Sequence, residues 1–151
     1  MKNKVMWSLV VVLGIIVVGM GLWFLLSFAN QGSYQSMDDG INIKVSNHVS
    51  KSPELSFQLV TAEEDKTELI NINSLKEQES ILFNSKLVPK KDYQMYVYYV
   101  LDGIQHKESL LYVPAHSTKL VIDLDIKSIK NGKIIFDKSG FDGWNKFNNE
   151  D

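Results

Sequence analysis

The hydrophobic pattern of the chain changes near residue 30. Residues 5–29, VMWSLVVVLGIIVVGMGLWFLLSFA, are an apolar run without a charged side chain. Beyond residue 40, apolar and polar residues alternate in short runs separated by turn-forming residues. The first pattern predicts a long apolar helix, and the second predicts β-strands with one buried face.

The apolar run predicts a transmembrane signal anchor over residues 5–29. At about 1.5 Å of rise per residue, it is long enough to cross a hydrocarbon core of about 30 Å. Trp7 and Trp23 lie near its two ends, where indole rings favour the headgroup region. Gly14 and Gly21 lie on one stripe, which would let a second helix approach closely. We therefore expect contact with the lipid bilayer through 5–29 and leave homo-oligomer formation open.

The lysine distribution predicts how this anchor is oriented. Lys2 and Lys4 precede the apolar run, and no further basic residue occurs before Lys44. The positive-inside bias therefore places residues 1–4 in the cytoplasm and the C-terminal domain outside, at the cytoplasmic membrane. The alternative is a signal peptide cleaved after Ala29, but secretory apolar cores are usually shorter, about 7–15 residues.

The remainder of the chain predicts an all-β fold. A polar, Gly- and Ser-containing segment, 30–40, predicts a flexible stalk. Short alternating runs at roughly ten-residue spacing then predict a β-sandwich or barrel over 41–139. Residues 140–151 predict a polar C-terminal tail. The alternating runs are 41–45, 54–60, 68–73, 80–88, the tyrosine-rich stretch 92–113 with two runs, 119–126 and 132–137.

The stretch 92–113, DYQMYVYYVLDGIQHKESLLYV, predicts a β-hairpin. Asp102-Gly103 between alternating apolar residues favours a two-residue type I′ turn. That turn pairs Tyr99 with His106, Val97 with Glu108 and Met95 with Leu110 on a face rich in large apolar groups, which should face the core. Tyr93 falls on the same face. Glu108 is the one charged side chain that this register turns inward.

The opposite face of the hairpin gathers a candidate contact site. Tyr96 and Tyr98 should point outward beside Ser109 and Lys107. Tyrosine offers a large contact area at a low entropic cost, so these residues could bind a partner. Ordinary strand propensity explains the same tyrosines without any function. Trp144 in the predicted tail is a further candidate for partner contact.

The hairpin region resembles immunoglobulin-like and fibronectin type III-like modules of bacterial surface proteins. The resemblance is carried by Leu87-x-Pro89, a tyrosine four residues after that proline, and the alternating apolar residues that follow. The later stretch VLDG…LLYVPAHSTKLVIDL is similar to the same superfamily. The resemblance implies an Ig-like β-sandwich ectodomain with a binding or spacer role, and it carries over no catalytic residues.

Composition restricts the function classes. All 16 basic residues are lysine, which together with frequent Asn and Ile predicts an AT-rich bacterial genome. The absence of cysteine excludes a disulfide and an acylated lipoprotein. The net charge is −2 and no basic stripe occurs, so we expect no nucleic-acid partner.

No sequence motif predicts catalysis or a cofactor. His48, His106 and His116 are far apart, whereas a zinc site needs three or four convergent ligands. Asp123 and Asp125 share a face of one predicted strand, where acids are usually solvated. Aspartates near residues 38–39 and 137–142 fit turns better than a calcium loop, although a structural calcium ion stays open. We expect no enzyme activity, no cofactor and no metal.

These observations predict a non-enzymatic single-pass membrane protein. Its extracytoplasmic β-sandwich would serve as an accessory or partner-binding subunit of a bacterial envelope assembly, binding a protein partner. One alternative is a secreted or envelope carbohydrate-binding module that uses Tyr96, Tyr98 and Trp144. A second alternative is an atypical envelope hydrolase that depends on a His/Asp pair.

Overall fold

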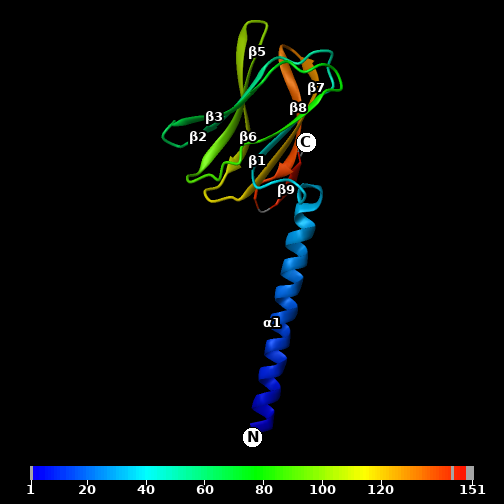
Figure 1. The fold of residues 1–151 in the computed structure, drawn as a ribbon, viewed down its shortest axis with the longest axis vertical. Coiled ribbons are helices and arrows are strands. Elements are labelled where there is room, and N and C mark those ends of the chain that lie inside the picture. The colour runs from blue at the N-terminus through cyan, green and yellow to red at the C-terminus, as the bar shows by residue number, and fades with distance from the viewer. Residues whose placement is uncertain (1, 144, 149–151) are drawn as a thin grey trace. The chain divides into compact units, whose positions relative to one another are not determined.

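The chain divides into two compact units, Met1–Gln35 and Ser36–Asp151. The computed structural model describes residues 2–143 and 145–148, leaving aside the side chains of 2–6, 8, 9, 27, 28, 30, 31 and 33. The first unit consists of helix α1 (Lys2–Gln31) and a short 3-10 helix, η1 (Gly32–Tyr34). The second unit holds the strands, and we call it the β-domain (Figure 1).

The predicted transmembrane signal anchor over 5–29 is wrong. Among the described residues, no helix combines the length and apolarity needed to cross a membrane. The predicted bilayer contact, the single-pass localisation in the cytoplasmic membrane and the extracellular position of the domain are corrected with it.

The residues assigned to the membrane lie on α1. Trp7 and Trp23 are exposed, as are Gly14 and Gly21. Their predicted membrane roles depended on the span and are withdrawn with it. Over the described residues the fold is therefore mostly β with one α-helix, and the transmembrane helix predicted to precede an ectodomain is not found.

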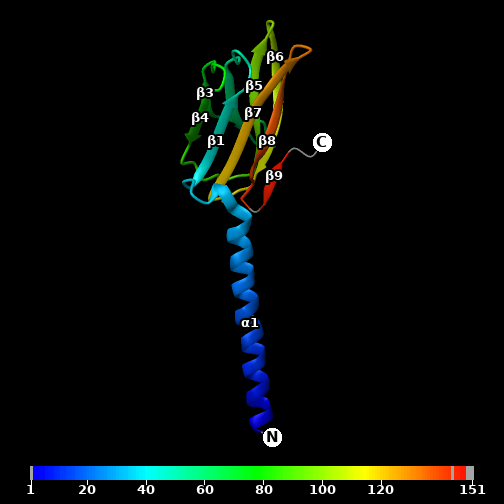
Figure 2. The ribbon, with the colours of Figure 1, turned by 90° about the vertical axis from the view of Figure 1, so that its right-hand side faces the viewer.

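Two sheets form the β-domain (Figure 2). The five-stranded sheet has the order β4-β1-β7-β8-β9, with β4 (Ser80–Asn84), β1 (Gly40–Asn47), β7 (Lys119–Lys130), β8 (Lys133–Phe141) and β9 (Lys146–Asn148). The four-stranded sheet has the order β3-β2-β5-β6, with β3 (Lys66–Ile72), β2 (Leu55–Val60), β5 (Tyr93–Leu101) and β6 (Ile104–Val113). Strands β1 and β7 are parallel, and the other neighbouring strands in both sheets are antiparallel.

Two hairpins use a turn in which both central residues have positive φ. Asp102 (φ 52°) and Gly103 (φ 76°) connect β5 to β6, which confirms the predicted type of turn. Asn131 (φ 52°) and Gly132 (φ 71°) connect β7 to β8 in the same way. This second turn lets both strands continue past the runs 119–126 and 132–137 that the alternation predicts.

The core of the β-domain lies between the two sheets. Strand β2 alternates buried and half-buried residues, as a strand with one buried face should. Strand β1 is buried along almost its whole length because it lies between β4 and β7. The two sheets contribute to one apolar cluster, which includes Ile41, Ile43 and Val45 of β1, Leu120, Ile122, Leu124 and Ile126 of β7, Leu55, Phe57 and Leu59 of β2, and Met95, Val97 and Tyr99 of β5. The resemblance to Ig-like modules stays a prediction.

The β-domain extends beyond the predicted boundary at residue 139. Strand β9 pairs Phe147 with Gly140 of β8, inside the segment predicted as a polar tail. A Cβ atom at Gly140 would lie 2.7 Å from Phe147 Cζ and closer still to the carbonyl oxygen of Val121. Glycine at this position therefore lets the last strand pack closely against the sheet.

Candidate functional site

Four of the predicted contact residues come together on the outer face of the four-stranded sheet. The register pairs Tyr96 of β5 with Ser109 of β6, and Tyr98 with Lys107. Both pairings are as predicted. The tyrosines are half-buried, and Lys107 and Ser109 are exposed. We call Tyr96, Tyr98, Lys107 and Ser109 the Tyr-Lys patch.

Lys107 holds its charge over both tyrosine rings of the patch. Its Nζ lies 3.8 Å from the ring centroid of Tyr96 and 5.8 Å from that of Tyr98. The two ring centroids are 6.4 Å apart and the rings are inclined by 53°. An ammonium group within about 6 Å of an aromatic centroid is attracted by the ring quadrupole. The patch is thus ordered by its own contacts before any partner arrives.

A bulge next to the patch changes the rest of the hairpin register. Between Met95 and Tyr96 the pairing shifts, so that Met95 faces Leu111 and not Leu110 as predicted. The extra residue lets both leucines be buried. Tyr112 in consequence points outward, with 55% of its surface exposed. A strict two-residue alternation cannot bury two consecutive leucines, and this is why the simple register failed here.

Two hollows flank the Tyr-Lys patch. One, of about 390 Å³, adjoins Tyr98, and the other, of about 280 Å³, adjoins Tyr96. Many lining side chains carry amide, hydroxyl or carboxylate groups, so a partner would meet hydrogen-bonding groups on both sides of the tyrosines. The first hollow is lined by Pro53, Glu54, Leu55, Ser56, Asn71, Ile72, Asn73, Tyr98, Tyr99, Val100 and Gln105, and the second by Val60, Thr61, Ala62, Asp92, Tyr93, Gln94, Tyr96 and Tyr112.

On the core side of the same hairpin, Tyr99 gives the inward-facing Glu108 a partner. The Tyr99 hydroxyl donates to Glu108 Oε1 at 2.7 Å and accepts from the backbone N–H of Ile134 at 3.3 Å. Its ring stacks on His106 with centroids 4.9 Å apart and meets Phe136 edge-on. Burial, followed by the hydrogen bond to Glu108, raises the pKa of Tyr99 to about 12. Tyr99 is in the core as predicted, and Tyr93 is partly buried and packs against the apolar cluster of the core.

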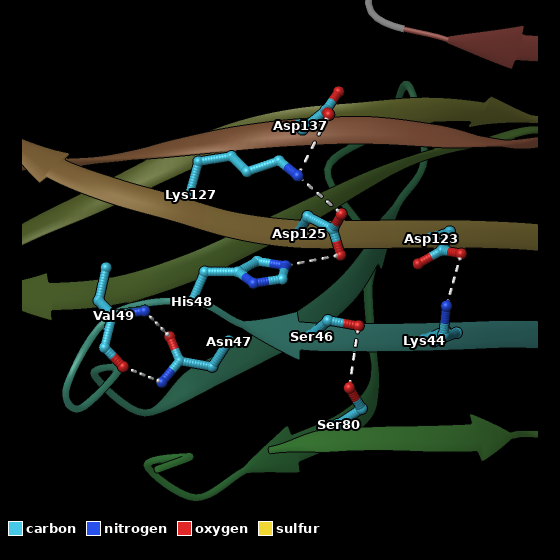
Figure 3. A network of polar contacts seen from close by, with 10 residues as sticks. All are labelled: Lys44, Ser46, Asn47, His48, Val49, Ser80, Asp123, Asp125, Lys127 and Asp137. Carbon is cyan, nitrogen blue, oxygen red and sulfur yellow. Dashed lines mark hydrogen bonds and ion pairs between the residues drawn. The ribbon is translucent and has the colours of Figure 1, made fainter. Parts of the chain in front are cut away.

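A second polar arrangement covers the outer face of the five-stranded sheet (Figure 3). Its members come from β1, the residue that follows β1, and β4, β7 and β8. Asp123 and Asp125 do share this face, as predicted, but both are paired with cations. The contacts are Lys44 Nζ to Asp123 at 2.9 Å, Ser80 to Ser46 at 3.0 Å, His48 Nε2 to Asp125 at 3.7 Å, and Lys127 Nζ to Asp125 at 3.1 Å and to Asp137 at 3.7 Å.

Asp125 is the centre of this arrangement. Burial acts to raise its pKa, but the hydrogen bond and charge of Lys127 outweigh burial and lower the pKa below 3.8. The charge of His48 and a hydrogen bond from Ser46 act in the same direction. The same contact with Asp125 raises the pKa of Lys127. The carboxylate is therefore stabilised in its ionised form.

The geometry around Asp125 does not match a Ser-His-Asp catalytic triad. In a catalytic triad the histidine accepts the proton of the nucleophilic hydroxyl. Here the hydroxyl of Ser46 bonds to Asp125 and accepts from Ser80, while His48 lies on the carboxylate. Within residues 2–143 and 145–148, no group of three His, Cys, Asp or Glu side chains is placed to hold a metal ion. His116 lies apart, in a turn with φ 62°.

Asn47 is a buried residue with a structural role that the sequence pattern did not reveal. Asn47, at the end of β1, donates from Nδ2 to the carbonyl oxygens of Val49, Leu75 and Lys76. Its Oδ1 accepts from the Val49 N–H at 3.2 Å (Figure 3). The side chain thereby connects two loops to the sheet. A serine-asparagine-histidine sequence is ordinary turn composition, so local sequence held no signal of this role.

Trp144, the fifth predicted contact residue, lies outside the described residues. Comparison of the chain with protein-family models, with curated proteins and with solved structures found no match in any of the three. The fold and the site therefore define only a general class of protein. It is a mostly β protein whose two-sheet domain carries an aromatic and cationic surface patch.

Proposed function

We propose that the β-domain is a non-enzymatic binding module and that the Tyr-Lys patch docks a protein partner. The chain would act as an accessory subunit of a larger assembly. The observation that carries this proposal is the position of Lys107 Nζ over both Tyr96 and Tyr98. Ordered tyrosines bury a large area at a small entropic cost, and such residues are enriched in protein interfaces. The envelope location followed from the anchor, so it is no part of this proposal.

The ring geometry favours a protein over a carbohydrate. A sugar stacks best on a free and flat aromatic face. Lys107 Nζ occupies one face of Tyr96 at 3.8 Å, and the two rings are inclined by 53°. A protein partner can place a carboxylate on the lysine and apolar groups against the ring edges. The flanking hollows supply hydrogen-bonding groups for either class of ligand, so the choice rests on the rings.

Crosslinking in cells of the source organism tests the proposal. The full chain carries a tag after Asp151, and captured proteins are identified for the wild type and for the Tyr96→Ala/Tyr98→Ala variant. We expect one reproducible protein partner whose recovery falls at least tenfold in the double variant. Undiminished capture of the same partner by the double variant would contradict the proposal.

Ile135→Ala provides the matched control. Ile135 is a large exposed apolar residue of β8, in the other sheet. The Ile135→Ala substitution should leave capture of the partner unchanged. All variants should melt within a few degrees of the wild type. If glycan binding, and not protein capture, is lost in the double variant, the ligand class is carbohydrate and the protein-partner proposal is replaced.

A further inference from the structure

Strand β4 is an open edge of the five-stranded sheet. Among the strands that the structure describes, it pairs with β1 alone and has no strand on its other side. Figure 2 shows β4 at the border of this sheet, and Figure 3 shows it beside β1. An unpaired edge presents backbone donors and acceptors to any strand that can align with it. Its chemistry therefore determines what it can bind.

The hydrogen-bond pattern identifies the backbone groups that point away from β1. The Asn47 N–H donates to the Glu79 carbonyl at 2.9 Å, and the Ser85 N–H donates to the Ile41 carbonyl at 3.0 Å. Hydrogen-bonded and non-hydrogen-bonded pairs alternate along an antiparallel ladder. Residues 79, 81, 83 and 85 therefore face β1. The N–H and C=O groups of residues 80, 82 and 84 point to the open edge.

The side chains of β4 leave apolar surface exposed on both faces of the sheet. Leu82 pairs with Lys44 and thus lies on the outer face, where it is 56% exposed. Ile81 lies on the core side and is still 37% exposed, next to the half-buried Phe83. Natural edge strands usually prevent association with a lysine, a proline or a bulge. The sequence from Ser80 to Asn84 and its regular pairing with β1 contain none of these.

The strand is complementary to itself in antiparallel register. With Leu82 opposite its own copy, Ile81 faces Phe83 and Ser80 faces Asn84, so apolar meets apolar and polar meets polar. Residues that face each other in this register lie on the same face of the joined sheet, because side chains alternate with period two. The three outward-pointing backbone positions also face one another in this register, so each donor meets an acceptor.

The ends of β4 support the same register. Gln78 (φ 64°) and Lys86 (φ 52°) leave the extended conformation at equal distances from Leu82. The N-terminal end carries the acidic Glu77 and Glu79, and the C-terminal end carries the basic Lys86. An antiparallel copy brings each acidic end to a basic end, and opposite charges across neighbouring strands stabilise the pair.

We propose that a second copy of this chain pairs with β4 in antiparallel register centred on Leu82. The two five-stranded sheets then continue into one another across a twofold axis, the usual symmetry of a homodimer. This interface lies in the other sheet from the Tyr-Lys patch and does not depend on it.

A cysteine at position 82 tests the register directly, because the chain contains no native cysteine. Hydrogen-bonded antiparallel partners have Cα atoms about 5.5 Å apart, within the range that a disulfide spans. Full-length Leu82→Cys should form a disulfide-linked dimer under mild oxidation. Ser80→Cys alone should stay largely unlinked, whereas Ser80→Cys mixed with Asn84→Cys should give a linked heterodimer. Ile135→Cys, exposed on β8, is the control for random collision and should stay unlinked.

Sedimentation of the cysteine-free chain over a range of concentrations provides the second measurement. We expect a monomer–dimer equilibrium that Leu82→Lys weakens at least tenfold and that Ile135→Lys leaves unchanged. A monomer at every concentration, or association that Leu82→Lys does not affect, would overturn the proposal. Hydrogen exchange gives a further outcome that would overturn the proposal. If the β4 amides are protected only when a different protein is added, the edge belongs to another partner.

Discussion

Tyr99 Oη and Glu108 Oε1 lie 2.7 Å apart in a hydrogen bond across the β5–β6 hairpin. The same hydroxyl accepts the backbone N–H of Ile134, which belongs to β8 in the other sheet. One phenol therefore satisfies an inward-facing carboxylate and also connects the two sheets. This relationship explains why a charged residue can occupy a core-facing position of β6.

Removing the Tyr99 hydroxyl should destabilise the β-domain. Tyr99→Phe leaves the Glu108 carboxylate and the Ile134 N–H without this partner, and we expect a loss of about 1.5–3 kcal/mol in the free energy of unfolding. Urea denaturation measures the change. Tyr98→Phe, on the outer face of the same strand, should change it by less than about 0.5 kcal/mol. A Glu108→Leu change in the Tyr99→Phe background should recover part of the loss, and equal, additive costs for the two changes would contradict the coupling.

Alkaline pH should destabilise the β-domain through Tyr99. The pKa of Tyr99 rises from 10.0 to about 12 on folding, so the folded state holds this proton more tightly than the unfolded chain. The resulting stability is complete below pH 10 and is lost as the pH rises toward about 12. Urea midpoints across this interval should fall less steeply in Tyr99→Phe than in the wild type.

Tyr112 is the control for that pH dependence. Burial, followed by a hydrogen bond to Asp92, raises the pKa of Tyr112 as well, but its side chain is largely exposed. Tyrosinate absorbance should lose its highest-titrating component in Tyr99→Phe. If Tyr112→Phe removes that component instead, our assignment of the alkaline transition to Tyr99 is wrong.

Much of the hairpin could be predicted because its signals are local. Asp102-Gly103 specifies the turn, and alternation from that turn places Tyr96 and Tyr98 beside Ser109 and Lys107. The bulge at Met95 could not be predicted, because the burial of Leu110 and Leu111 is decided by the opposite sheet. The partner of Glu108 could not be predicted either, because Tyr99 lies opposite His106 and reaches Glu108 diagonally, and its hydroxyl also bonds to β8.

Acid should destabilise the domain through Asp125. Although burial opposes ionisation, the hydrogen bond and charge of Lys127 hold the pKa of Asp125 below 3.8 in the folded state. The associated stability is present above pH 3.8 and is lost as the pH falls through the folded-state pKa. Lys127→Met should raise the pKa of Asp125, and an NMR titration that follows its carboxyl carbon measures this change. Lys138→Met on β8 is the control, and an unchanged Asp125 titration in Lys127→Met would contradict the pairing.

Replacing the Asn47 amide by a carboxylate should be costly. Asn47→Asp keeps the shape of the side chain but removes the donor to the Val49, Leu75 and Lys76 carbonyl oxygens. It also buries a charge beside those oxygens, and we expect a loss of at least about 2 kcal/mol in unfolding free energy. Asn73→Asp, at an exposed position, is the matched control for chemical denaturation. Equal effects of the two changes would show that the buried contacts of Asn47 contribute little.

The apolar run 5–29 predicted a helix, which α1 confirms, and a membrane span, which is wrong. An apolar run identifies a helix, and α1 does include residues 5–29. The membrane span was a further step, and the described part of the helix does not support it. Similarly, the alternation ended β7 too early because Lys127 and Lys130 are polar, although the Asn131-Gly132 turn marks the true end of the hairpin.

The parallel pairing of β1 with β7 has a consequence for synthesis on the ribosome. Strand β1 leaves the ribosome first of the β-domain strands, yet its partner along one side begins at Lys119. Contacts between such distant segments form late and slow folding. A nascent chain that ends after β6 can complete the four-stranded sheet. The edge of β1 that later pairs with β7 is still exposed at that stage. Until β7 emerges, this edge of β1 is therefore open to pairing with other strands.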